Sequence, residues 1–182
     1  LQYPDFFFPG KTQYEKSDPP KDIVIKSVIN SINPFNWFAV ANKIIKEKPD
    51  FLIVRYWLPF MAPCLGTICY LIKSKNKILA ITDNVIPHEK RFGDFILTKY
   101  FIGSCHAFIT LSKSVLDDLS RFTKTNNKKF IAHPIYDTFG EIVKKEDAIN
   151  KLNLSKENKY LLFFGFVRKY KGLDLMLEAI AD

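Results

Sequence analysis

The sequence contains little glycine and little cysteine. Only 7 of its 182 residues are Gly, which excludes collagen-like chains and Gly-rich linkers. Its 3 cysteines, Cys64, Cys69 and Cys105, are odd in number and include no Cys-x-x-Cys pair. Neither a disulfide framework nor a zinc site is therefore indicated. The natural interpretation is a protein of a reducing compartment, and we expect a cytoplasmic location.

Signals for membrane insertion and export are also lacking. The stretch Tyr56–Ile72 carries no charge over 17 residues, but it is short for a membrane span and contains Pro59, Pro63 and Gly66. We expect a buried helix there. Leu1–Gly10 lacks the basic and apolar regions of a signal peptide. The chain starts without Met and ends inside a helical pattern, so we expect a piece truncated at both ends.

The composition is that of a globular protein with a basic surface. Hydrophobic residues make up 47% of the chain and charged residues 25%, which is enough apolar material for a packed core. The formal net charge is +8 and the isoelectric point is about 9.3. Such an excess favours a phosphorylated small molecule, an anionic membrane or nucleic acid as partner, and the charge alone does not choose among them.

Short β-rich runs alternate with helical patterns over most of the chain. Asn33 and Pro34 are typical of an N-cap and a first helical position, and we expect this helix to end near Lys48, before Pro49. Further helices are expected within 56–72, up to about Ser104, and over 115–122. The candidate strands are Asp22–Ile29, Phe51–Tyr56, Lys77–Thr82, Ala107–Leu111 and Phe130–Ala132. This alternation predicts an α/β, Rossmann-like domain with a parallel sheet.

A second α/β unit is expected after a linker. The stretch from His133 to Lys145 contains Pro134, Gly140 and several polar residues, as interdomain linkers do. A helix over 146–152 and a strong strand over 159–164 follow, and then a basic loop and a helix over 173–181. We therefore divide the chain into a first Rossmann-like domain (1–135), a linker (136–145) and the start of a second Rossmann-like domain (146–182).

The segment GFVRKYKG, Gly165 to Gly172, is the strongest candidate for a binding site. Glycine at a strand end lets backbone approach a ligand closely, and the following helix N-terminus offers free N–H groups to an anion. Arg168, Lys169 and Lys171 add positive charge, so a diphosphate is the expected ligand. The segment matches neither the P-loop nor the Gly-x-Gly-x-x-Gly fingerprint. A solvated basic turn is the other interpretation of the spacing.

The order of these blocks resembles the family 4 retaining glycosyltransferases, whose GT-B fold has two Rossmann-like domains. YLLFFGFVRKYKGLDLMLEAIA is similar to the start of that family's donor domain. KPDFLIVRYW and CHAFITLSKSVLDDL are similar to blocks of its acceptor domain, and HPIYDTF stands where the family has a turn before its linker. The resemblance covers roughly residues 40–182.

This resemblance implies transfer of a sugar from a nucleotide-diphosphate sugar to a glycan or lipid-linked acceptor, with retention, in envelope polysaccharide or glycolipid synthesis. Lys171 matches the family's diphosphate-binding Lys, and Gly165 and Gly172 frame the same site. Arg168 stands two places after the usual Arg position, which Phe166 occupies here, and is expected to substitute for it. No metal or other cofactor is implied, because basic side chains stabilise the leaving diphosphate in this family.

The acceptor side is expected in the loop after 77–82. The family often has a His directly after this strand, whereas here Asp83 takes that place and His88 follows five residues later. Asp83 and His88 are therefore the catalytic candidates, and for His88 a structural or merely exposed role is an equal alternative. The family's N-terminal Gly-rich loop and its pair of glutamates fall outside the chain, so we expect this piece alone to be inactive.

Two other functions remain open from the sequence. One is a non-catalytic basic α/β module that binds nucleic acid or phosphorylated ligands, and the other is a GT-B nucleotide-sugar epimerase. The basic residues are scattered and not interleaved with aromatics as in RNA-binding motifs, so we expect no nucleic-acid partner. Peripheral contact with an anionic membrane would also account for the net charge.

Overall fold

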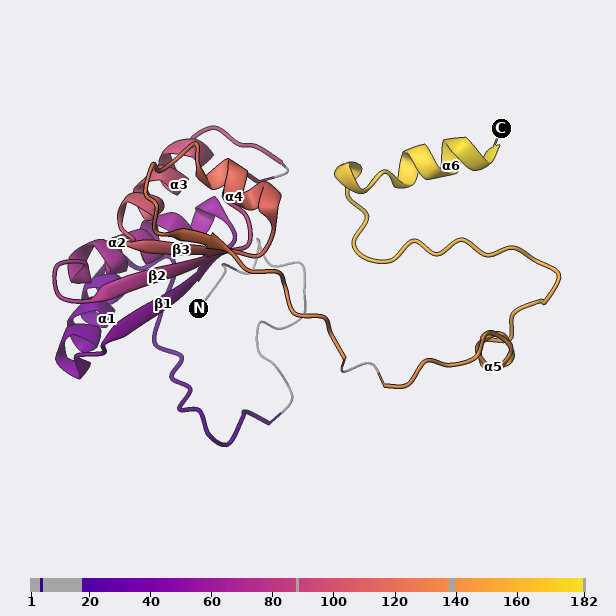
Figure 1. The fold of residues 1–182 in the computed structure, drawn as a ribbon, viewed down its shortest axis with the longest axis horizontal. Helices are drawn as coiled ribbons and strands as arrows, with labels where there is room; N and C mark the ends of the chain where they lie inside the picture. The colour runs from indigo at the N-terminus through magenta and orange to yellow at the C-terminus, as the bar shows by residue number, and fades with distance from the viewer. Residues whose placement is uncertain (1–3, 5–17, 88, 138–139, 182) are drawn as a thin grey trace. The chain divides into compact units, whose positions relative to one another are not determined.

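The computed structural model describes residues 4, 18–87, 89–137 and 140–181. The chain divides into two compact units, Leu1–His133 and Pro134–Asp182. The first unit is an α/β unit with a four-stranded, wholly parallel sheet of order β1-β2-β3-β4, as expected of a Rossmann-like arrangement (Figure 1). Its strands are β1 (Phe51–Tyr56), β2 (Lys77–Thr82), β3 (Ala107–Thr110) and β4 (Lys128–Phe130).

Helix α1 (Pro34–Glu47) has the ends that its sequence predicts. The Asn33 side chain accepts hydrogen bonds from the backbone N–H groups of Phe35 at 3.0 Å and Asn36 at 3.4 Å. These bonds satisfy donors that the first helical turn leaves without partners. Lys48 ends the helix in the left-handed conformation, and its N–H donates to the carbonyl of Ile44. Local capping chemistry thus fixes both ends of α1.

The uncharged stretch after β1 forms a 3-10 turn over Pro59–Met61 and then the short helix α2 (Ala62–Ile72). Most of α2 is buried between α1 and α3 (Asp94–Gly103). Gly66 permits this close packing, since a Cβ there would lie 2.7 Å from the ring of Tyr100 on α3. Within the part of the chain that the structure describes, no helix is long and apolar enough to cross a membrane.

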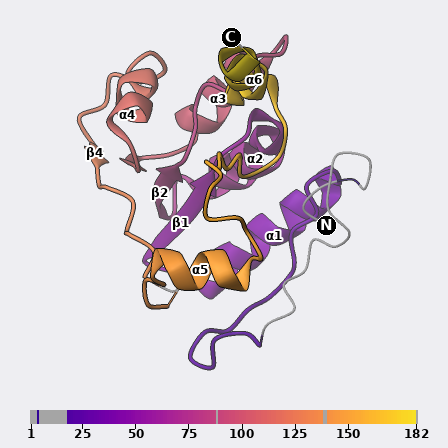
Figure 2. The same cartoon turned by 90° about the vertical axis from the view of Figure 1, so that its right-hand side faces the viewer.

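The rest of the first unit follows the expected order with shifted boundaries. Ser112 caps α4 (Lys113–Leu119) by accepting from the N–H of Val115 at 3.2 Å. The last strand, β4, begins two residues earlier than the predicted 130–132. Helix α4 lies beside β3 and β4, whereas α1 lies by β1 in both views (Figures 1 and 2).

The two faces of the sheet differ in burial. Alternate residues of the strands, such as Val54, Tyr56 and Ile78, are buried in the core with α2 and α3. The Tyr56 ring stacks on Phe101, with centroids 4.2 Å apart. On β1 the intervening residues Phe51 and Ile53 are about 60% exposed.

The strand predicted over Asp22–Ile29 does not form. These residues are exposed, and among the described residues no strand pairs with the outer edge of β1. The end of this segment is bonded to α1 instead: the Asn36 amide donates to the carbonyl of Val28 at 3.0 Å. The Trp37 indole donates to the carbonyl of Asn30, just beyond the segment, at 2.8 Å. Side-chain bonds from a neighbouring helix thus replace a strand ladder.

The second unit contains α5 (Lys145–Lys151), a 3-10 turn over Lys169–Lys171, and α6 (Leu173–Ala181), which has the predicted bounds. The strand predicted over Lys159–Phe164 is absent from the described structure, and its apolar side chains Leu161, Leu162 and Phe164 are exposed. A strand needs a partner for its backbone groups, and the described part of this unit provides none.

Candidate functional site

Asp83 lies at the carboxyl edge of the parallel sheet, directly after β2. Its backbone N–H donates to the carbonyl of Tyr56 at 2.9 Å, and its Oδ2 accepts from Nε of Arg55, on β1, at 2.8 Å. The Asp83 side chain is 23% exposed and that of Arg55 61%. The second carboxylate oxygen, Oδ1, is buried and accepts no hydrogen bond from the described residues. Asp83 is therefore a carboxylate held by Arg55, and its buried oxygen has no partner among the described residues.

Arg55 is the residue of this site that sequence reasoning missed. It is the one charged residue in an otherwise apolar strand, FLIVRY, and its partner Asp83 directly follows the neighbouring strand, β2. The parallel register places Arg55 opposite Ile81, two residues before Asp83. A lone charge near the end of an apolar parallel strand was the available signal, because such strand ends border the ligand crevice of open α/β sheets.

A buried pair of polar side chains, Tyr56 and Thr98, lies at the end of β1 next to this site. The hydroxyl of Tyr56 lies 3.0 Å from that of Thr98 on α3. Burial raises the pKa of Tyr56 to about 12, the negative charge of Asp94 adds to the rise, and the bond to Thr98 opposes it. Tyr56 therefore stays protonated at neutral pH and acts as a structural support for the strand end.

The loop after Asp83 is only partly described. His88, the second catalytic candidate, lies outside the described residues. Val85 is buried, and the N–H of Arg91 donates to Oδ2 of Asp94 at 2.7 Å at the start of α3. This hydrogen bond ties the end of the loop to the first residue of α3.

In the second unit, the turn from Gly165 to Gly172 brings two predicted site residues together. Gly165 has φ +117° and Gly172 has φ +67°, both in the region that favours glycine. The Lys171 side chain folds back over Gly165, so that a Cβ on Gly165 would lie 2.5 Å from Lys171 Nζ. A side chain at position 165 would displace this ammonium group.

The turn places positive charge next to the start of α6. The N–H of Lys171 donates to the carbonyl of Arg168 at 2.9 Å, and that of Gly172 to the carbonyl of Lys169 at 3.1 Å. The side chains of Arg168, Lys169 and Lys171 are all exposed. Asp174 in the first turn of α6 partly offsets the positive charge. The arrangement is suited to an anion held mainly by Lys171 and backbone N–H groups.

The two halves of the predicted site belong to different units, Asp83 to the first and Lys171 to the second. The described residues contain no group of three or more His, Cys, Asp or Glu side chains that could hold a metal ion. Comparison with protein-family models, curated proteins and solved structures gave no match. The functional assignment therefore rests on the chemistry of the residues themselves.

Proposed function

We propose that the protein transfers a sugar from a nucleotide-diphosphate sugar to a glycan or lipid-linked acceptor, with retention at the anomeric carbon. The observation that carries this proposal is the turn in which Lys171 folds over Gly165 at the beginning of α6. A flexible ammonium group, a backbone without a Cβ and a helix N-terminus together form a site complementary to a diphosphate. The similarity of the surrounding segment to the family 4 donor domain supports the same ligand.

In this proposal the basic turn stabilises the leaving group. As the bond between the anomeric carbon and the diphosphate breaks, negative charge grows on the phosphate oxygens, and Lys171 with Arg168 lowers the energy of that charge. Asp83 lies at the carboxyl edge of the sheet, where open α/β sheets bind their ligands. Held by Arg55 at 2.8 Å, its carboxylate is proposed to accept a hydrogen bond from an acceptor hydroxyl.

Turnover of the full-length protein tests the proposal. It is incubated with UDP-, GDP- and ADP-linked hexoses and a lipid extract as acceptor, and released nucleoside diphosphate is measured together with the anomeric configuration of the product. We expect release from one nucleotide class, a product with the donor's configuration and a loss of at least tenfold in Lys171→Ala, since a charge-assisted hydrogen bond contributes about 1.5–3 kcal/mol.

Lys159→Gln is the matched control, because it removes an exposed lysine just upstream of the same turn and should keep full activity. Asp83→Asn should raise the KM for the acceptor and leave nucleotide affinity unchanged. Equal loss in Lys171→Ala and Lys159→Gln, or a product of inverted configuration, would contradict the proposal.

A further inference from the structure

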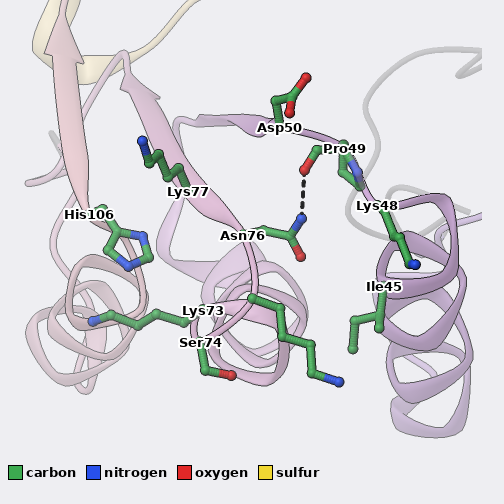
Figure 3. Close-up of a pocket in the computed structure, with 10 residues that line it drawn as sticks. Ile45, Lys48, Pro49, Asp50, Lys73, Ser74, Asn76, Lys77 and His106 are labelled. Carbon is green, nitrogen blue, oxygen red and sulfur yellow. Dashed lines mark hydrogen bonds between the residues drawn. The ribbon is translucent and has the colours of Figure 1, made fainter.

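A groove lies at the amino ends of the strands, at the other edge of the sheet from Asp83. It has a volume of about 790 Å³, within the range of small-molecule sites. Six residues of strand, roughly 20 Å, separate the two edges. Its lining residues come from the ends of α1 and α2 and the starts of β1, β2 and β3 (Figure 3): Ile45, Lys48, Pro49, Asp50, Lys73, Ser74, Lys75, Asn76, Lys77 and His106.

We propose that this groove binds a phosphate ester. Four lysines line it, and one acidic residue, Asp50, is present among the described lining residues. Lys48 and Lys75 are exposed and form no ion pair within the described parts of the chain. Two ammonium groups are thus available to an anion, in a concavity where neighbouring charges reinforce one another.

The groove is held in shape by contacts between its walls. The Asn76 amide donates to the carbonyl of Pro49 at 2.8 Å (Figure 3), which joins the turn before β2 to the turn before β1. Lys73 Nζ donates to the carbonyl of Gly103 at 2.6 Å, and Lys77 Nζ lies 5.6 Å from the centre of the Phe51 ring. These contacts give Lys73 and Lys77 fixed positions, so part of the site is preorganised before a ligand binds.

The imidazole of His106 adds a hydrogen-bond donor to the groove. Its Nδ1 accepts from the N–H of Ile78 at 3.2 Å, so a neutral ring carries its proton on Nε2. Figure 3 shows that second nitrogen turned toward the Lys73 side chain. Ammonium, imidazole N–H and the Ser74 hydroxyl all donate, and phosphate oxygens accept, so the groove and a phosphate ester are chemically complementary.

Helix dipoles explain the positions of only two of the four groove lysines. Lys48 and Lys73 directly follow α1 and α2, where a helix C-terminus favours a cation without any ligand. Lys75 and Lys77 lie beyond that turn and line the same groove. The inference is independent of the proposed glycosyl transfer, because it concerns a different edge of the sheet and a different ligand.

The experiment is an amide NMR titration of the ¹⁵N-labelled protein with glycerol 3-phosphate, and in a second arm with phosphatidylcholine vesicles with and without phosphatidic acid. Glycerol alone is the uncharged control. We expect saturable shifts at the groove amides in at least one arm. Shifts with glycerol 3-phosphate identify a soluble ester, whereas binding only to vesicles that contain phosphatidic acid identifies a lipid headgroup.

Variants distinguish binding in the groove from general attraction of an anion to a basic surface. The pair Lys48→Gln and Lys75→Gln should weaken binding at least tenfold, whereas Lys99→Gln with Lys113→Gln, exposed lysines of α3 and α4 outside the groove, should leave it unchanged. Asp50→Asn should tighten binding about threefold, which no loss of folding can mimic. Absence of binding in both arms, or equal weakening by both lysine pairs, would overturn the proposal.

Discussion

Replacing Gly66 by Ala is expected to destabilise the first unit although alanine is the better helix former. A Cβ at this position would lie 2.7 and 2.8 Å from two ring carbons of Tyr100 and 3.4 Å from the Cα of Phe101. The ring cannot move away freely, because the Tyr100 hydroxyl lies 3.0 Å from that of Thr67. Overpacking costs about 1–3 kcal/mol and the gain in helix propensity is about 1 kcal/mol. A net loss of about 1 kcal/mol follows.

A double-mutant cycle with Tyr100→Ala measures this clash directly. Removing the ring opens the space, so Gly66→Ala should then stabilise the unit by up to about 1 kcal/mol. Urea unfolding followed by tryptophan fluorescence gives the free energy of each variant. If Gly66→Ala has the same effect with and without the Tyr100 ring, the two helices do not meet at this glycine and the reasoning is refuted.

Two further predictions concern buried ionisable groups. Burial raises the pKa of Tyr56 from its ordinary value of 10.0 to about 12. Its contribution to stability is therefore complete below pH 10 and is lost as the pH rises to 12. Wild type should lose roughly 2–3 kcal/mol more than Tyr56→Phe over that interval in urea unfolding. Burial also raises the pKa of the Cys64 thiol to about 11, and a hydrogen bond with Cys69 and burial raise that of Cys105. A thiol reagent at pH 8 should label these cysteines only after urea unfolds the chain, and rapid labelling of the native protein would contradict their burial.

The sequence predicted correctly those helices and strands whose bounds are set by residues within or next to the element. The bounds of β1, β2 and α6 are those expected, and Asn33 with Pro34 and Lys48 defines α1. Strand propensity was misleading at Asp22–Ile29 and Lys159–Phe164, because it reports how well side chains suit a half-buried sheet and not whether a neighbouring strand is present. Side chains of α1 bond instead to the carbonyls of Val28, in the first segment, and Asn30, just after it, and no local sequence pattern predicts these bonds.

The candidate sites divide in the same way. The spacing from Gly165 to Lys171 indicated the basic turn, since its residues are close in sequence. The Arg55–Asp83 pair joins the ends of two strands and depends on their parallel register. That register cannot be read from the sequence. The groove lysines follow α1, follow α2 or begin β2. They are far apart in the sequence, and only the fold brings them together.

Calorimetric titration of the full-length protein with UDP, GDP and ADP tests the central claim most directly. The account predicts that one nucleoside diphosphate binds, that Lys171→Ala weakens this binding at least tenfold, and that Lys159→Gln leaves it unchanged. Binding of none of the three, or affinity that is unaffected by Lys171→Ala, would contradict the assignment of the turn that precedes α6 as a diphosphate site.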